Sequence, residues 1–277
     1  MGFQDLYFLG ETSLEEKPTT WMDWVLDSDY VENMMEFMIP ENKKFFSFYT
    51  TISTHGIYDY SNSRFEEFYN IYDANLHNFK GWLEKEGFVY PNTAEDEHRL
   101  REYKAGAIDM DKAIGLIIAE LERQNILDET TIVLYADHNV YLNNLSNTIK
   151  NIDVWETSDI ELHNIPFIIY NTKISASENT NFCSTYDIYP TICDLFGFKY
   201  SSILTQGYSV FDEDISKTIF VSFKTGIFNL NYYTEDLMTI KELKKNLSST
   251  KLNFFESLNE FLKKQQYING VYKAGLF

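Results

Sequence analysis

The order of hydrophobic and polar positions along the chain predicts short buried strands separated by helices. Residues 43–53, "KKFFSFYTTIS", are rich in aromatic and β-branched side chains, which is typical of a buried strand, and they run into "THG". The segment 130–136, "TTIVLYA", has the same character. Two further stretches, "IPFIIYN" (165–171) and "TIFVSF" (218–223), also predict strands.

A long helix is predicted between the first two of these strands. Thr93 and Asp96 form a start that resembles a capping box, and the helical pattern ends near Asn125. Between them, one apolar face repeats at helical spacing and consists of Ala107, Met110, Ile114, Ile117, Ile118 and Leu121. Strand, long helix and strand in this order form a βαβ unit, which predicts that 43–53 and 130–136 are parallel.

Shorter helices are predicted elsewhere in the chain. The aromatic and acidic stretch 58–79 predicts helix and loop, and residues 184–198 predict a helix that stops at Gly197. The tail adds predicted helices at 236–246 and 250–265. Together these elements predict the α/β fold class, with a mostly parallel sheet flanked by helices.

The composition of the 277-residue chain excludes some functions. There is no apolar run of roughly 18 residues, and the N-terminus lacks the basic start and apolar core of a signal peptide. We therefore expect a soluble chain without a membrane span. The formal net charge of −19 argues against nucleic-acid binding, which needs a basic face. Cys193 lies in an apolar helical pattern and is expected to be buried, and a disulfide with Cys183 is left open.

Polar side chains with metal-binding chemistry follow two of the predicted strands. The first strand ends at His55, and the second runs directly into Asp137 and His138. In an open parallel sheet, ligands bind beyond the carboxyl ends of the strands, so parallel strands bring these three residues to one edge. A carboxylate with a neutral imidazole suits Mn²⁺ or Zn²⁺. The alternative is that Asp137 caps the next turn and His138 is an ordinary surface histidine.

The other histidines are weaker candidates for this site. His77 and His98 fall in polar, helical surroundings and are expected to be solvated. His163 stands at the start of its strand, at the wrong end for the site. We expect none of these three residues to bind the metal.

Four segments in a fixed order resemble a known family. They are "FFSFYTTISTHGIYDY" (45–60), "LDETTIVLYADHN" (127–139), "HNIPFIIYN" (163–171) and "STYDIYPTICDLFGFKYSSILTQGYSVF" (184–211). The same order occurs in the sulfatase-like branch of the alkaline phosphatase superfamily. Within that branch the chain is most similar to lipoteichoic acid synthases and related phosphoglycerol transferases.

This resemblance implies a role for each matched residue. Asp137 and His138 match the pair that binds the catalytic divalent cation, which is Mn²⁺ in the synthases, with Zn²⁺, Mg²⁺ or Ca²⁺ as alternatives. His55 matches a histidine that contacts the phosphate or glycerol-phosphate group of the substrate. Asp187 and Pro190 match a D-x-x-P-T segment that opens a helix packed under the sheet. The implied chemistry is a two-step transfer: a metal-bound threonine attacks phosphatidylglycerol, diacylglycerol leaves, and the glycerophosphoryl group passes to a growing polymer.

The chain departs from the family pattern upstream of His55. There the family carries a further acidic metal ligand, its threonine nucleophile and substrate-contacting Trp and Arg residues, which have no clear counterparts in this sequence. Thr12 follows no acid-ended strand and stands too close to His55 to be that nucleophile. The resemblance therefore predicts an alkaline-phosphatase-like domain that is incomplete at its N-terminus. Residues 1–212 would form the C-terminal portion of the catalytic domain, and 213–277 a smaller α+β extension.

Two functions fit the sequence. The first is part of a metal-dependent phosphoglycerol transferase or sulfatase-like enzyme that acts on lipid-linked phosphate or sulfate esters and is inactive alone. Its parent protein would be membrane-anchored, with the catalytic domain outside the cytoplasm. The second is a non-catalytic binding or partner subunit that keeps the fold. In either case an incomplete sheet leaves a bare edge, which predicts a homo-oligomer or a cover formed by residues 21–38.

Overall fold

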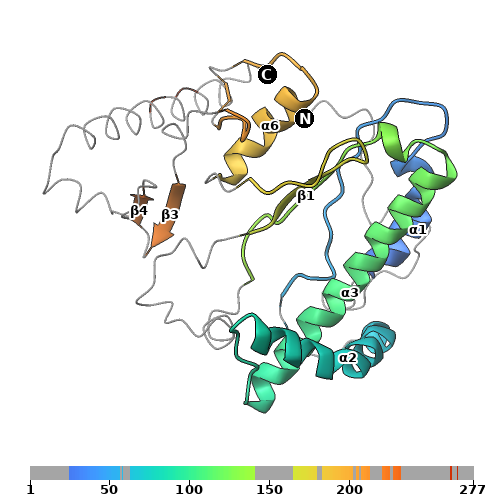
Figure 1. The fold of residues 1–277 in the computed structure, drawn as a ribbon, viewed down its shortest axis with the longest axis vertical. Helices are drawn as coiled ribbons and strands as arrows, with labels where there is room; N and C mark the ends of the chain where they lie inside the picture. The colour runs from blue at the N-terminus through green and yellow to red at the C-terminus, as the bar shows by residue number, and fades with distance from the viewer. Residues whose placement is uncertain are drawn as a thin grey trace, which may run out of the picture. The chain divides into compact units, whose positions relative to one another are not determined.

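The computed structural model describes a defined part of the chain: residues 25–56, 58, 63–140, 165–179, 183–201, 204–205 and 207–212, strands at 220–224 and 227–231, and residues 263 and 267. The chain divides into two compact units, Met1–Ser175 and Ala176–Phe277 (Figure 1). The domain boundary expected after residue 212 stays a prediction. No helix in the described ranges is long and apolar enough to cross a membrane.

Three α-helices lie in the described part of the first unit. They are α1 (Asp27–Met38), α2 (Glu66–Lys85) and α3 (Ala94–Arg123), and a 3-10 turn, Ser63–Phe65, leads into α2. Both α1 and α2 pack against α3 (Figure 1). The start of α3 confirms the predicted cap, because the Thr93 side chain accepts a hydrogen bond from the backbone N–H of Asp96.

The face of α3 that is buried differs from the predicted apolar face. Of the predicted residues only Leu121 is buried, and the other five are half-buried. The remaining buried positions of α3 include polar ones and are Leu100, Glu102, Ala105, Gly106, Asp109 and Ala113. The two acids are tolerated there because they accept hydrogen bonds, as from the Tyr69 hydroxyl to Glu102 at 2.6 Å. Apolar spacing alone therefore did not identify the side of this helix that is most deeply buried.

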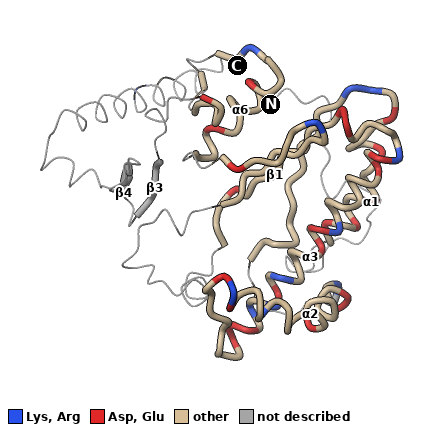
Figure 2. Tube along the Cα trace, viewed as in Figure 1, with Lys and Arg blue, Asp and Glu red and all other residues tan. Residues whose placement is uncertain are grey.

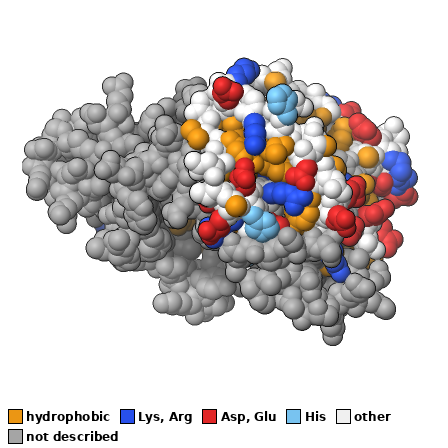
Figure 3. Space-filling model, turned by 90° about the horizontal axis from the view of Figure 1, so that it is seen from below, with side chains coloured by type: hydrophobic (Ala, Val, Ile, Leu, Met, Phe, Trp, Pro, Cys, Tyr) orange, Lys and Arg blue, Asp and Glu red, His pale blue; other side chains and the backbone are white. Residues whose placement is uncertain are grey.

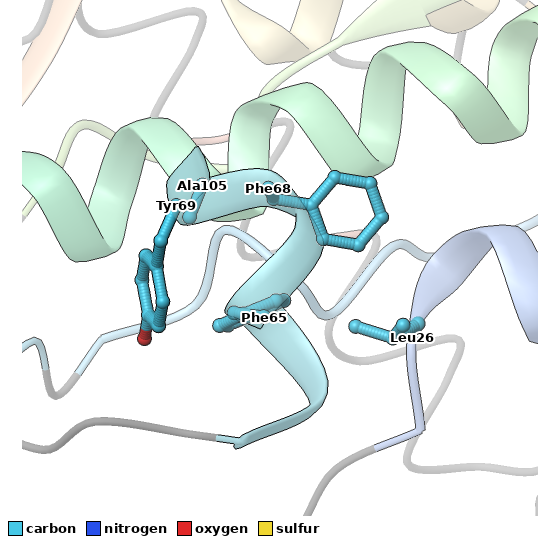
Figure 4. Packing of buried hydrophobic residues seen from close by; sticks show 5 residues of the cluster. All are labelled: Leu26, Phe65, Phe68, Tyr69 and Ala105. Atoms are coloured by element: carbon cyan, nitrogen blue, oxygen red, sulfur yellow. The ribbon is translucent and has the colours of Figure 1, made fainter. Parts of the chain in front are cut away.

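A small aromatic core joins the beginning of α1 to α2 and α3. Leu26, Phe65, Phe68, Tyr69 and Ala105 form the cluster (Figure 4). The Phe65 ring lies edge-on to Phe68, with 6.3 Å between ring centroids, and edge-on to Tyr69, with 6.1 Å. Edge-to-face geometry of this kind adds to the stabilisation that comes from burial.

We expect Phe68 to be the side chain of this core whose truncation costs most, because it is only 1% exposed. Phe68→Ala should lower the free energy of unfolding by about 3–5 kcal/mol through lost burial and the cavity left behind. Trp82, on the same helix but 50% exposed, supplies the control, and Trp82→Ala should cost roughly 1 kcal/mol or less. Urea denaturation of both variants measures the difference, and equal losses would contradict the assignment of the core.

The sheet of the first unit is antiparallel. β1 (Ile132–Tyr135) pairs with β2 (Phe167–Tyr170), with Ile132 opposite Tyr170. These two strands confirm the predictions at 130–136 and 165–171. Helices together with strands agree with the predicted α/β class, whereas the sheets that the structure describes contain antiparallel pairs only.

The prediction of a strand at 43–53 is wrong, and so is the parallel βαβ pairing that depended on it. No strand is assigned in this segment. The backbone N–H groups of Ile52 and Ser53 donate to the carboxylate of Asp27, at 2.9 and 3.0 Å, and not to a neighbouring strand. Phe46 and Phe48 are 66% and 60% exposed, so the aromatic residues that suggested a buried strand do not all enter a core.

The described part of the second unit contains a short helix and a pair of antiparallel strands. A 3-10 turn, Thr185–Asp187, leads into α6 (Ile188–Leu195), and β3 (Phe220–Lys224) pairs antiparallel with β4 (Ile227–Asn231). α6 ends before Gly197, whose φ of 65° permits the left-handed turn that closes the helix. The helix at 184–198 and the strand at 218–223 are thus confirmed. The predicted helices at 236–246 and 250–265 lie outside the described residues, apart from Lys263.

Exposed hydrophobic side chains are frequent on the described surface. Figure 3 shows them between basic (Lys or Arg), acidic and histidine side chains on the face seen from below. On the β1–β2 sheet, Ile168 and Tyr170 are 51% and 42% exposed. Residues 27–38 of the segment expected to cover a sheet edge form α1, which packs against α3. Self-association through the sheet stays a prediction.

Candidate metal and substrate site

The pair Asp137 and His138 directly follows β1. The strand ends at Tyr135, and the chain then bends, so that the two adjacent side chains are not held on opposite faces of a strand. The Asp137 side chain is 79% exposed and that of His138 is 38% exposed. Both residues are therefore accessible from solvent, as a site that binds a cation and a substrate requires.

The orientation of the His138 ring is set by the backbone. Its Nδ1 lies 2.7 Å from the carbonyl oxygen of Asn139. A carbonyl oxygen can only accept, so Nδ1 carries the proton and the lone pair of the neutral ring is at Nε2. That nitrogen lies 3.6 Å from Oδ2 of Asp137. The acidic oxygen and the basic nitrogen thus face each other at the end of β1.

This geometry fits one shared divalent cation. With metal–ligand bonds of about 2.1 Å, neighbouring ligand atoms of a tetrahedral or octahedral site lie roughly 3.0–3.4 Å apart, close to the observed separation of the pair. A backbone carbonyl on the second ring nitrogen is also the usual arrangement for a metal-binding histidine. Within the described ranges no group of three or more His, Cys, Asp or Glu side chains could hold a metal. Cation binding by the pair stays a prediction, and it would need further ligands.

His55 lies in the same compact unit as the pair. It is exposed and ends a turn that its backbone N–H closes by donating to the carbonyl of Ile52 at 2.9 Å. Its Nδ1 donates to the carbonyl of Gly56, as that of His138 does to the carbonyl of Asn139. The predicted convergence rested on two parallel strands, which the structure does not contain at 43–53. A pocket shared by His55 and Asp137 stays a prediction.

The other sequence candidates have structural roles or lie outside the described residues. Asp187 is buried, and burial raises the pKa of its carboxyl. Its carboxylate accepts from the backbone N–H groups of Ser184 and Tyr208, at 2.7 and 2.8 Å, which gives it the architectural role that the resemblance implies. Thr12 and His163 are not among the described residues.

The remaining histidines and cysteines match their expectations in part. His77 is exposed, as expected, whereas His98, which was expected to be solvated, is half-buried and lies 3.9 Å from the Glu102 carboxylate. Cys183 and Cys193 are both free thiols, so the disulfide that the sequence left open is not formed. Cys193 is buried, as its apolar pattern predicted.

The structure contains one buried group of polar residues that no pattern in the sequence predicted. Asp27, Ser53 and Asp109 are buried together and are connected by hydrogen bonds, and Ser53 lies two residues before His55 in the chain. Burial raises the pKa of Asp27, while hydrogen bonds from Tyr49, Ile52 and Ser53 act in the opposite direction. In the sequence, Asp109 is an acidic residue within a long predicted helix. Acidic residues on helices are usually exposed to solvent, so its position did not indicate a buried network.

The chain belongs to the sulfatase family, because a model of that family matches residues 1–198. Two curated relatives are lipoteichoic acid synthases 1 and 2 of Bacillus subtilis (strain 168). They are 25% identical over 146 residues (50% of this chain, 22% of the relative) and 22% identical over 151 residues (51% and 23%). The matched part of the chain thus spans less than a quarter of either synthase. Among solved structures, the lipoteichoic acid synthase LtaP from Listeria monocytogenes matches with a TM-score of 0.43 at 18% identity, over 65% of this chain and 48% of LtaP.

Proposed function

We propose that this chain carries the cation-binding and phosphate-binding part of a metal-dependent phosphoglycerol transferase. The observation that carries the proposal is the Asp137–His138 pair after β1, in which a fixed imidazole nitrogen faces a carboxylate at 3.6 Å. Membership of the sulfatase family and similarity to lipoteichoic acid synthases support it. The proposed substrate is a lipid-linked phosphoglycerol, the proposed cation is Mn²⁺, and the parent protein acts outside the cytoplasmic membrane.

In the proposed site, Asp137 and His138 bind the cation, and His55 binds the substrate. Asp137 provides a carboxylate oxygen and His138 provides Nε2, while the Asn139 carbonyl holds the His138 ring. Asp137 and His138 would hold the divalent cation, which would supply activation of the attacking hydroxyl and would offset negative charge on the phosphoryl oxygens. His55, when protonated, donates from Nε2 to a phosphate oxygen.

The charge of the protein makes such local positive groups necessary. The formal net charge is −19, and acidic residues are spread over α1, α2 and α3 (Figure 2). An anionic phosphate ester is repelled by the field of such a protein. Binding of a phosphoglycerol therefore depends on the cation and on His55, which counteract that field at the site.

Calorimetric titration of sn-glycerol 1-phosphate into the Mn²⁺-loaded chain tests the proposed role of His55. We expect binding in the wild type, because the cation and a protonated imidazole both attract the phosphate. His55→Ala should weaken it on the order of tenfold, which is the effect of losing one hydrogen bond to a charged group. His77→Ala removes another exposed histidine of the same unit and should leave the affinity unchanged. Equal affinity of the wild type and His55→Ala would contradict the assignment.

The second candidate is a non-catalytic subunit that keeps the sulfatase fold. The high exposure of Asp137 and the absence of a third ligand among the described residues are the observations that favour it. The same titrations separate the two functions, because a non-catalytic subunit is expected to bind neither Mn²⁺ nor sn-glycerol 1-phosphate. Binding of both ligands at this site would rule it out.

A further inference from the structure

The turn that carries His55 is held by side chains of a helix and not by a sheet. Residues 52–55 form one hydrogen-bonded turn, since His55 N–H donates to the Ile52 carbonyl at 2.9 Å. No strand is assigned from residue 43 to this turn. The position of the His55 backbone, from which the imidazole extends, therefore depends on what holds Ile52, Ser53 and Thr54.

Asp109 of α3 accepts several of the hydrogen bonds that hold this turn. Its side chain is 0% exposed, and its carboxylate accepts hydrogen bonds from the Ser53 hydroxyl, from the Asp27 backbone N–H at 2.7 Å and from the Ser28 hydroxyl at 2.6 Å. A buried carboxylate with several fixed donors permits little movement of any of them. Ser53 is thereby held against α3.

Asp27 reinforces the same attachment from the other side. Its carboxylate accepts from the backbone N–H groups of Ile52 and Ser53, at 2.9 and 3.0 Å, and from the Tyr49 hydroxyl at 2.5 Å. The Asp27 backbone N–H also donates to the Ser53 hydroxyl oxygen at 3.0 Å. The start of α1, the turn and α3 are thus locked together by polar contacts.

Gly106 allows the turn to approach α3 this closely. A Cβ atom at this position would lie 2.0 Å from the Ser53 carbonyl oxygen and 3.3 Å from the Thr54 nitrogen. Both neighbours are backbone atoms, which cannot yield as a flexible side chain does. Any larger residue at 106 must displace the turn. Gly115 on the same helix has no atom within 4 Å of the equivalent position.

Tyr58 attaches the far side of the turn to the same stripe of α3. Its hydroxyl donates to the Thr54 carbonyl at 2.5 Å. Its ring lies edge-on to Tyr103 of α3, with 5.7 Å between the centroids. Tyr103, Gly106 and Asp109 follow one another at three-residue intervals on α3, so one side of this helix contacts the turn and Tyr58.

We infer that Tyr103, Gly106 and Asp109 of α3 are positioning residues, which hold the turn 52–55 so that His55 is presented to the phosphate of the substrate. The inference rests on the proposed role of His55. None of the three residues touches substrate. They act through Ser53 and Thr54 on the placement of the imidazole, and misplacing such a contact by about 1 Å can weaken its effect on the order of a hundredfold.

The pair Gly106→Ala and Gly115→Ala tests this inference in the full chain. Both replacements favour the helix to the same degree, so only the contact with the turn distinguishes them. Nitrogen–proton NMR correlations of the imidazole rings are recorded without metal, with His77 on α2 and His98 on α3 as internal references. In Gly106→Ala we expect the His55 signals alone to shift, and in Gly115→Ala none. Affinity for sn-glycerol 1-phosphate should fall on the order of tenfold or more in Gly106→Ala only.

A second variant covers the case in which Gly106→Ala does not fold. Ser53→Ala removes the hydroxyl that connects the turn to Asp109 without adding volume. It should shift the His55 signals in the same way. Unchanged His55 signals and affinity in a folded Gly106→Ala, or in Ser53→Ala if the first variant unfolds, would overturn the inference. If the wild type does not bind sn-glycerol 1-phosphate, the proposed role of His55 fails, while the ring signals still decide whether α3 positions the turn.

Discussion

Asp137→Ala and His138→Ala should each abolish measurable Mn²⁺ binding by this chain. The wild type is expected to bind the ion weakly, because two exposed ligands leave most of the coordination sphere to water. Removal of either ligand leaves a single donor, and the affinity should fall on the order of a hundredfold or more. Titration calorimetry measures the binding, and the heat should disappear in both variants.

Asp128→Ala is the matched control for this metal prediction. Asp128 is another exposed carboxylate of the same unit, and it lies 3.6 Å from the Lys173 ammonium group. Its removal should leave Mn²⁺ binding unchanged, since a general loss of negative charge has little effect on a specific site. Tight Mn²⁺ binding that survives Asp137→Ala would show that other residues of the chain hold the ion.

The second large effect is expected on stability, from Asp109→Ala. This change leaves the buried Ser28 and Ser53 hydroxyls without this acceptor, and the Asp27 backbone N–H keeps only its weaker bond to the Ser53 hydroxyl oxygen. Each unsatisfied buried donor costs about 1–3 kcal/mol, so the free energy of unfolding should fall by about 3 kcal/mol or more. Urea denaturation followed by circular dichroism gives this difference, provided that the slope with denaturant stays constant.

Asp111→Ala provides the comparison on the same helix. Asp111 is exposed, and its replacement should change the free energy of unfolding by roughly 0.5 kcal/mol or less. If Asp109→Ala were as mild as Asp111→Ala, the buried network would not stabilise the fold. The same result would weaken the case that Asp109 holds the turn before His55.

Local signals in the sequence predicted several elements correctly. The β-branched runs at 132–135 and 167–170 form strands, Thr93 caps α3, and Gly197 closes α6 through its positive φ. In each case the decisive contact lies within a few residues, or the side chain itself favours the conformation. The proposed cation-binding pair Asp137–His138 was also taken from the sequence, because its two members are adjacent and follow a strand, and its role stays a prediction.

The surroundings of His55 depended on contacts that no local pattern contains. The segment 43–53 has the composition of a strand, yet Asp27 takes the backbone N–H groups that would pair it with a neighbour. The bond from Asp27 to Asp109 joins positions 82 residues apart, and that from Ser53 to Asp109 joins positions 56 apart. Sequence composition determined which residues could form strands, helices and a cation-binding pair. Tertiary structure decided which stripe of α3 is buried, because a buried carboxylate is stable only where distant donors meet it.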